Sequence, residues 1–291
     1  MKKRIIVLGV LFAILSLTKT NAQILSDKSM GALGKGVSGF TFSDADAAAL
    51  AKQSIAELDA NNPVAGPKDG YSIRLDRLFG KHTTSEGVTL NYKVYLVKDI
   101  NAFACADGSV RVFAGLMNIM DDNQLLAVIG HEIGHVVNHD TRDAIKAAYK
   151  KEALLDAASS QSGKIETLTQ SQLGQLGSAM IDSKHSRKQE SEADSFSYDF
   201  MKKNGYDVNA VESAFRILQN LSEGAEASFM TKMMSSHPDS GKRADTAKKQ
   251  ATKDGLYHAY EQQKIDNTAP VTQTKKATTT TTKKTSKAKK K

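Results

Sequence analysis

The spacing of hydrophobic and polar residues changes along the chain and predicts strands in one short region. Residues 88–113 are rich in β-branched and aromatic residues, in the segments Val88–Val97, Ala102–Ala104 and Ser109–Phe113. Such runs are typical of strands, and Asp107-Gly108 between the last two is a strong hairpin signal. We therefore expect a small antiparallel sheet in this region.

Helical patterns precede and follow these strands. An alanine-rich run extends from Ser43 to about Asp59, and the Ser43 hydroxyl is suited to cap its first backbone N–H groups. The prolines and glycines of residues 61–67 end this helix, and a second helix is expected around Ser72–Phe79. From Asp121 onward the pattern is helical again. The fold class is therefore α+β: mainly helical, with the sheet on one side.

The first 22 residues resemble a secretory signal peptide. Basic residues Met1–Arg4 precede 13 apolar residues, Ile5–Leu17, and small residues follow at Thr20–Ala22. The apolar run is shorter than the roughly 20 residues that a membrane-spanning helix needs, although an uncleaved N-terminal anchor is the alternative. No cysteine follows the run, which argues against a lipoprotein. We expect an exported, most simply periplasmic, protein with no transmembrane span in its mature chain.

The net charge of +8 is concentrated at the two ends of the chain. Residues 1–22 carry +4 and residues 265–291 carry +7, which leaves −3 for residues 23–264. A folded part that is mildly acidic gives no reason to expect a nucleic-acid partner. The Thr- and Lys-rich residues 265–291 are predicted to be a disordered tail, because they have almost no apolar side chains to bury. Weak contact of this tail with an anionic surface is the functional alternative.

The strongest chemical signal is His131-Glu132-Ile133-Gly134-His135, which follows an apolar helical run. In a helix, residues four apart share a face, so both histidines point the same way. Two imidazoles at that spacing bind one Zn²⁺, and Glu132 then lies where a general base is needed.

A third protein ligand has to come from elsewhere in the chain. In the extended motif a third histidine follows six residues after the second, but Thr141 occupies that position. The best candidate is Glu190, on a predicted helix that reaches about Lys203. Asp194 shares its face and is suited to accept the outward N–H of a ligating histidine.

Several segments in order resemble one known family. They are Asn101–Ala104 with Gly108 and Gly115, then His131–His135, Ser186–Asp194, Gly205–Asp207, and Ser236 through Arg243. Together they are similar to the zinc metallopeptidases of the HtpX and CAAX-prenyl-protease type, over residues of about 50–250. Since no later apolar span is present, the chain resembles the soluble exported branch, which includes periplasmic outer-membrane-assembly peptidases.

The resemblance implies a fold and a set of roles. The fold is a zincin domain of the gluzincin type, in residues 23–264, with the motif helix beneath the sheet and the Glu190 helix crossing it. His237 and Arg243 lie near the metal in the family, where they stabilise the oxyanion, or His237 takes the open zinc position at rest. The resemblance also implies that His131, His135 and Glu190 bind the metal and that Glu132 is the general base. Asp194 accepts a hydrogen bond from a ligating histidine. The strand that binds substrate comprises Asn101, Ala102, Phe103 and Ala104.

The resulting hypothesis is a metalloendopeptidase with one Zn²⁺ per chain. Its expected substrates are extended segments of unfolded or misassembled envelope proteins, including outer-membrane assembly proteins. One alternative is a zinc-stabilised chaperone or assembly factor with latent proteolysis, and another is an envelope-surface binder acting through the lysine tail. Cys105, the single cysteine, is expected to be a small buried residue beside the strand. His185 gives no signal beyond that of a surface residue.

Overall fold

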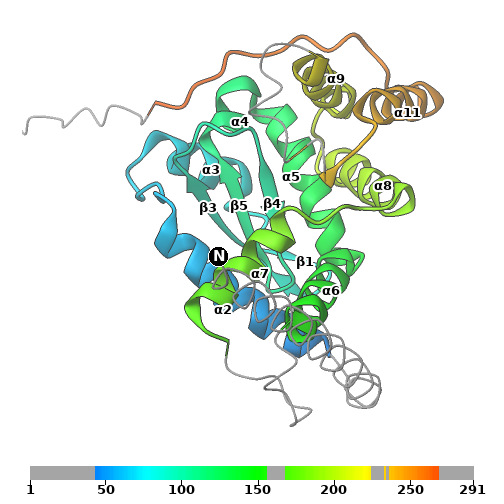
Figure 1. The fold of residues 1–291 in the computed structure, drawn as a ribbon. Helices are drawn as coiled ribbons and strands as arrows, with labels where there is room; N and C mark the ends of the chain where they lie inside the picture. Colours follow the sequence, from blue (N-terminus) through cyan, green and yellow to red (C-terminus); the bar gives the residue numbers. More distant parts are fainter. Residues whose placement is uncertain (1–42, 156–167, 224–232, 234–235, 269–291) are drawn as a thin grey trace, which may run out of the picture.

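The computed structural model describes residues 43–155, 168–223, 233 and 236–268 (Figure 1). The predicted signal peptide, residues 23–42 and the tail beyond residue 268 lie outside the described residues. The main helices are α2 (Asp44–Asn61), α3 (Gly70–Phe79), α4 (Ala114–Ile119), α5 (Asp122–Val137), α6 (Asp140–Leu155), α7 (Gln170–Ile181), α8 (Arg187–Lys203), α9 (Asn209–Glu223) and α11 (Ser240–Lys253). The mainly helical α+β class is confirmed.

The strands form two small sheets. They are β1 (Thr84–Ser85), β2 (Val88–Thr89), β3 (Asn91–Tyr95), β4 (Ala102–Ala104) and β5 (Ser109–Phe113). β1 and β2 pair with each other, while the larger sheet has the order β3-β5-β4. The predicted hairpin is confirmed, because β4 and β5 are antiparallel and pair Ala102 with Val112.

The expectation of a purely antiparallel sheet was wrong. β5 lies between β3 and β4 and runs parallel to β3, with Asn91 opposite Ser109. The chain reverses direction after β3 and again at Asp107-Gly108, so β5 regains the direction of β3. Gly108 adopts φ 82°, and a Cβ there would lie 2.0 Å from the carbonyl oxygen of Thr89. The turn therefore requires glycine.

Side-chain caps fix the starts of the helices that carry the chemistry. Ser43, Asp121 and Ser186 are the N-caps of α2, α5 and α8, and each forms a reciprocal capping box with the residue three positions later. Such pairs satisfy backbone N–H groups that a helix otherwise leaves free. The beginnings of α5 and α8 are thus set by their local sequence.

Two hydrophobic clusters pack on the larger sheet. The main core joins the sheet to α3, α4, α5, α8, α9 and α11, and the motif helix α5 packs against β4, β5 and α8. The outer core joins α2, α6 and α7 to side chains of the sheet, among them Tyr95, Phe103 and Phe113. Figure 1 shows α2, α6 and α7 gathered at one end of the sheet, away from α9 and α11. The motif helix α5 therefore belongs to the main core and lies against the sheet, as predicted.

The described chain ends in an extended segment, residues 256–268, which we call the strap. In Figure 1 it runs in orange from α11 across the top of the molecule. Tyr260 donates to Asp121 at the start of α5, and Asn267 accepts from the buried Arg74. Ordered contacts thus extend to Asn267, beyond the predicted boundary at residue 265.

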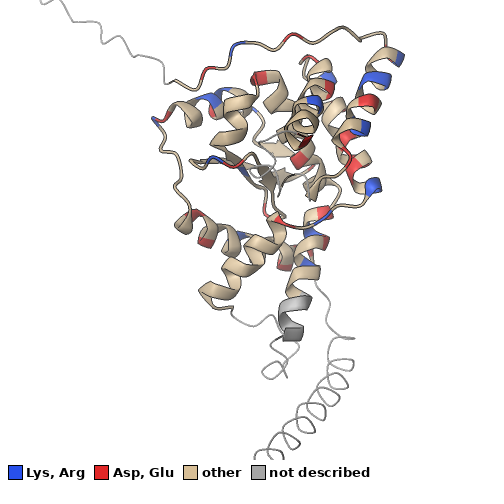
Figure 2. Ribbon diagram, turned by 45° about the horizontal axis from the view of Figure 1, so that its top comes forward, with Lys and Arg blue, Asp and Glu red and all other residues tan. Residues whose placement is uncertain are grey.

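Charged residues of both signs are distributed along the helices. Figure 2 shows Lys and Arg interspersed with Asp and Glu along α8, α9 and α11. Within the described ranges, no helix combines the length and apolar character needed to cross a bilayer.

Candidate metal centre

Residues from α5, α8 and the segment before α11 converge in the interior. His131, His135, Glu190 and His237 are all buried, and each offers a ligand atom within 4.8 Å of the others. His131 Nε2 lies 3.1 Å from His135 Nε2 and 3.2 Å from Nδ1 of His237. Glu190 Oε1 lies 2.9 Å from that His237 nitrogen. The structure thus brings the three predicted ligands together, with His237 beside them.

The donor set fits a divalent metal ion. Imidazole and carboxylate together are ligands for zinc and similar metals. Oε1 of Glu132 is buried without a hydrogen-bond partner among the described residues, whereas Oε2 of Glu190 pairs with Arg243 at 2.8 Å. Buried carboxylate oxygens without donors are costly, so a cation among these residues would compensate them.

Burial changes the acidity of Glu132, the predicted general base. Glu132 is 3% exposed, and burial raises the pKa of its carboxyl group. Its Oε1 lies 3.6 Å from Nε2 of His237. A raised pKa makes a carboxylate a stronger proton acceptor, which suits a general base.

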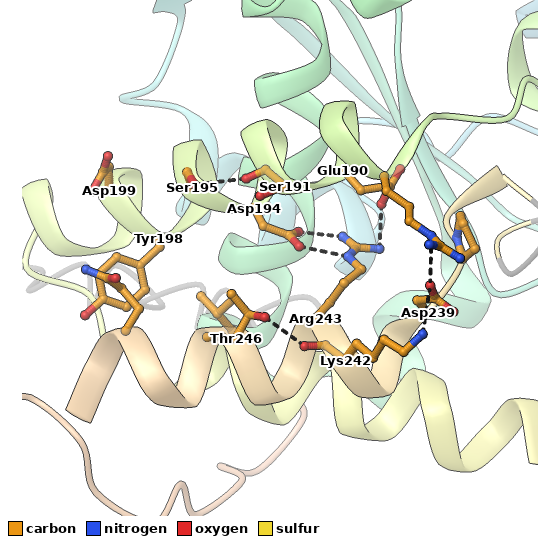
Figure 3. A pocket seen from close by; sticks show the side chains of 15 residues that line it. Glu190, Ser191, Asp194, Ser195, Tyr198, Asp199, Asp239, Lys242, Arg243 and Thr246 are labelled. Carbon is orange, nitrogen blue, oxygen red and sulfur yellow. Dashed lines mark hydrogen bonds and ion pairs between the residues drawn. The ribbon is translucent and has the colours of Figure 1, made fainter. Parts of the chain in front are cut away.

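Arg243 and Asp194 lie next to the predicted ligand Glu190, and all three line a pocket between α8 and α11 (Figure 3). Arg243 donates to both Asp194 oxygens, from Nε at 2.9 Å and Nη2 at 2.6 Å. Its Nη1 pairs with Glu190, and the guanidinium lies 4.0 Å from the ring centroid of Phe215. Asp194 Oδ1 is also 2.9 Å from Nδ1 of His131. The guanidinium therefore joins Glu190 and Asp194.

The two motif histidines have different electrostatic surroundings. Burial and the neighbouring Arg243 hold the pKa of His131 well below its usual value. Burial acts the same way on His135, but hydrogen bonds with Asp140 and Glu190 raise the pKa of His135 to about 9. Burial likewise opposes ionisation of Glu190, yet hydrogen bonds from His135 and His237 hold the pKa of Glu190 far below normal. Glu190 therefore keeps its charge.

The predicted substrate strand lies next to this centre but is covered. Asn101, Ala102, Phe103 and Ala104 are all at most 7% exposed, although β4 is an edge strand of its sheet. One narrow cavity is lined by β4 together with Glu132 and His135 on one side and by residues from α7 and the turn after it. The end of α7 and that turn therefore occupy the space along β4.

Sequence reasoning missed two residues of the centre. His185 was expected at the surface, but its ring stacks on that of His135 at 3.8 Å, and burial lowers the pKa of His185 to about 3. The available signal was its position next to Ser186, the N-cap of α8. Asp140 had no periodic relation to the motif, yet its Oδ2 lies 2.8 Å from His135 Nδ1. Cys105 is buried, as predicted, and lines the same cavity as β4.

Comparison with known proteins identifies relatives with the same chemistry. The model of peptidase family M48 matches residues 75–251. Metalloprotease YcaL of Escherichia coli is 42% identical over 205 residues, covering 70% of this chain and 79% of that protein. Metalloprotease LoiP of the same organism is 37% identical over 232 residues, covering 78% of this chain and 90% of that protein. The chain therefore belongs to peptidase family M48 and is a metalloendopeptidase.

Proposed function

We propose that this metalloendopeptidase binds one zinc ion through His131, His135 and Glu190 and degrades unfolded or misassembled proteins of the bacterial envelope. The observation that carries the proposal is the convergence of these buried donors beside Glu132. Two imidazoles and one carboxylate are a common protein ligand set of catalytic zinc, which keeps one position open.

The residues of the chain then divide the work of peptide hydrolysis. When bound, zinc supplies Lewis acidity that polarises a carbonyl group and eases removal of a proton from water. Glu132 accepts the proton from the attacking water and passes it to the leaving amine nitrogen. Asp194 orients His131, since its carboxylate lies against the outward nitrogen of that ring.

His237 and Arg243 take different roles in this proposal. The Arg243 nitrogens are engaged by Asp194 and Glu190, so we assign it to holding these carboxylates rather than to the oxyanion. His237 is within 3.2 Å of His131 Nε2 and lies beside Glu132, which suits a resting state in which its imidazole takes the open position. Activation then requires His237 to move away from the ligands.

Substrates are proposed to bind in extended form along β4. Pairing with an edge strand uses backbone hydrogen bonds and is largely independent of side chains, which suits unfolded proteins. Because residues 180–185 share the cavity beside β4, a peptide would have to displace them. Export to the periplasm and contact of the basic tail with anionic surfaces belong to the same proposal, resting on the sequence of the two ends.

A direct test measures cleavage of denatured casein by the purified zinc-loaded protein beside Glu132→Gln. We expect cleavage by the wild type, and a rate lower by about 10²–10⁴-fold in the variant, with zinc retained. Equal rates would exclude Glu132 as the base, and intact casein with both proteins would contradict broad proteolysis.

The rival function is a zinc-stabilised chaperone or assembly factor, favoured by the position of His237 within the ligand cluster. Glu132→Gln also separates these functions in cells that lack the gene. Full restoration of envelope integrity by this variant would favour the chaperone, whereas failure to restore it supports proteolysis.

A further inference from the structure

A buried hydrogen-bond chain reaches His135 from outside the ligand set. Oδ2 of Asp140 lies 2.8 Å from Nδ1 of His135, and both side chains are buried. The other Asp140 oxygen, Oδ1, accepts from Nε2 of Gln189 at 2.8 Å. Gln189 in turn accepts from the backbone N–H of Ser186 through Oε1, also at 2.8 Å. These hydrogen bonds therefore connect the N-cap of α8, through Asp140 at the start of α6, to His135.

The direction of each hydrogen bond is fixed by chemistry. The Gln189 oxygen is committed to the Ser186 N–H in the capping box, so its nitrogen has to face Asp140 as a donor. The Asp140 carboxylate only accepts, so Nδ1 of His135 has to donate to it. In the neutral ring that binds a metal, a proton on Nδ1 leaves the lone pair on Nε2, the nitrogen that faces His131 and Glu190.

The backbone is bent to make this contact. Between α5 and α6, His139 adopts φ 64°, in the left-handed region that residues other than glycine seldom occupy. This single residue separates Asn138, the C-cap of α5, from Asp140, the first residue of α6. The sharp change of direction returns Asp140 toward His135, five residues earlier. Unfavourable backbone conformations persist where the surrounding structure requires them, often at functional sites.

The two motif histidines are therefore held by different carboxylates. Asp194, which faces His131, also accepts from Nε and Nη2 of Arg243. Asp140 faces His135 and the neutral amide of Gln189. Among the described residues no guanidinium pairs with Asp140, and its carboxylate lies against His135, with the ring of His185 close by. Carboxylate acceptors of this kind fix the tautomer of a ligating histidine and increase its basicity.

We infer that Asp140 is the positioning residue of His135 and that Gln189 orients Asp140 through the capping box of α8. The inference rests on the proposed function, because it assigns His135 Nε2 to the metal. It predicts that α8 supports the centre twice: through Glu190 directly, and through Gln189 one residue earlier.

The test measures the affinity of the full-length purified protein for Zn²⁺ by competition with a chelator. We expect Asp140→Ala to weaken zinc binding by about 10–100-fold, the usual effect of removing such an acceptor. The matched control is Asp143→Ala, one turn further along α6, where the aspartate is exposed and pairs with Arg142. It should leave the affinity at the wild-type value. Equal affinities of Asp140→Ala and the wild type would overturn the inference.

A spectroscopic measurement separates positioning from general loss of structure. The visible spectrum of the Co²⁺-loaded protein reports the ligand geometry of the bound ion. We expect Asp140→Ala to change this spectrum and Asp143→Ala to preserve it, with circular dichroism of both proteins like the wild type. Identical cobalt spectra for the two variants would contradict a positioning role.

A reciprocal exchange keeps the inference testable if Asp140→Ala fails to fold. Gln189→Glu keeps an oxygen that accepts from the Ser186 N–H, but it places a second carboxylate against that of Asp140. Asp140→Asn instead places an amide nitrogen, a donor, against the donor nitrogen of Gln189. Both single variants should bind zinc more weakly. The double variant restores both hydrogen bonds with the groups exchanged, so it should bind more tightly than either single variant. If the losses of zinc affinity in the two single variants simply add in the double variant, the proposed hydrogen-bond chain is wrong.

These outcomes are distinguishable from failure of the proposed function. If the wild type itself fails to bind zinc, the proposed function is wrong. If the wild type and Asp140→Ala bind zinc equally well, only the role assigned to Asp140 is wrong.

Discussion

The two hydrophobic clusters of the molecule differ in what they support. The main core packs α5, α8 and α9 together beside the predicted ligands: the ring of Phe215 lies 6.1 Å from that of His131. The outer core joins α2, α6 and α7 to the sheet, with Leu176 fully buried in it. We therefore expect metal binding to depend on the main core, and the outer core to determine what covers β4.

The largest effect is expected in the main core. Phe215→Ala removes a buried ring that touches both His131 and the Arg243 guanidinium. It should lower the free energy of unfolding by about 3–5 kcal/mol and weaken zinc binding as well. Chemical denaturation and chelator competition measure the two quantities. Unchanged zinc affinity would break the proposed dependence of the centre on this core.

The outer core should lose stability without losing metal. Leu176→Ala on α7 creates a cavity among α2 and α6 side chains and should cost about 2–5 kcal/mol. Zinc affinity measured below the unfolding transition should equal that of the wild type. If it falls as in Phe215→Ala, the two clusters act as one unit, and the contrast between them is wrong.

The pH dependence of activity tests the burial of Glu132, which lines the cavity beside β4. Burial raises the pKa of Glu132, and the base acts only as a carboxylate. Activity should therefore fall as the pH decreases. The midpoint of this fall should lie above about 4.3, the normal pKa of an exposed glutamate. The acid limb of kcat/KM, measured where metal content is constant, gives this value. A limb at or below the ordinary value would contradict a buried base.

The smallest effect concerns the strap, which ties the end of the described chain to the main core. Asn267→Ala removes one of the two acceptors of the buried Arg74 Nη1, leaving the carbonyl oxygen of Met117, and should lower stability by about 1 kcal/mol. Thr268→Ala is the control, because Thr268 bonds to the adjacent Asp266 alone among its described contacts. Thermal unfolding of the pair measures the difference. Identical melting temperatures would show that the strap adds no stability.

Local sequence predicted the helices that carry the chemistry. The spacing of His131 and His135, and of Glu190 and Asp194, places each pair on one helix face, and these side chains converge in the structure. Ser43 caps α2 as the sequence indicates, and α5 begins directly after Asp121, where the helical pattern was expected to start.

Features that depend on distant contacts were not predictable from local pattern. The parallel pairing of β3 and β5 depends on which strand enters the middle of the sheet, and strand composition carries no such information. The short helix α4, between β5 and α5, was not predicted. Asp140 reaches His135 through the left-handed residue His139, a backbone conformation that no hydrophobic periodicity indicates.

The measurement that tests the central claim most directly is the zinc content of the purified wild type, Glu190→Ala and Glu192→Ala. Glu192 lies on the same helix, is about half exposed and pairs with Lys188, so it is the matched control. We expect about one zinc per chain in the wild type and in Glu192→Ala, and loss of zinc in Glu190→Ala. Full zinc content in Glu190→Ala would contradict this expectation.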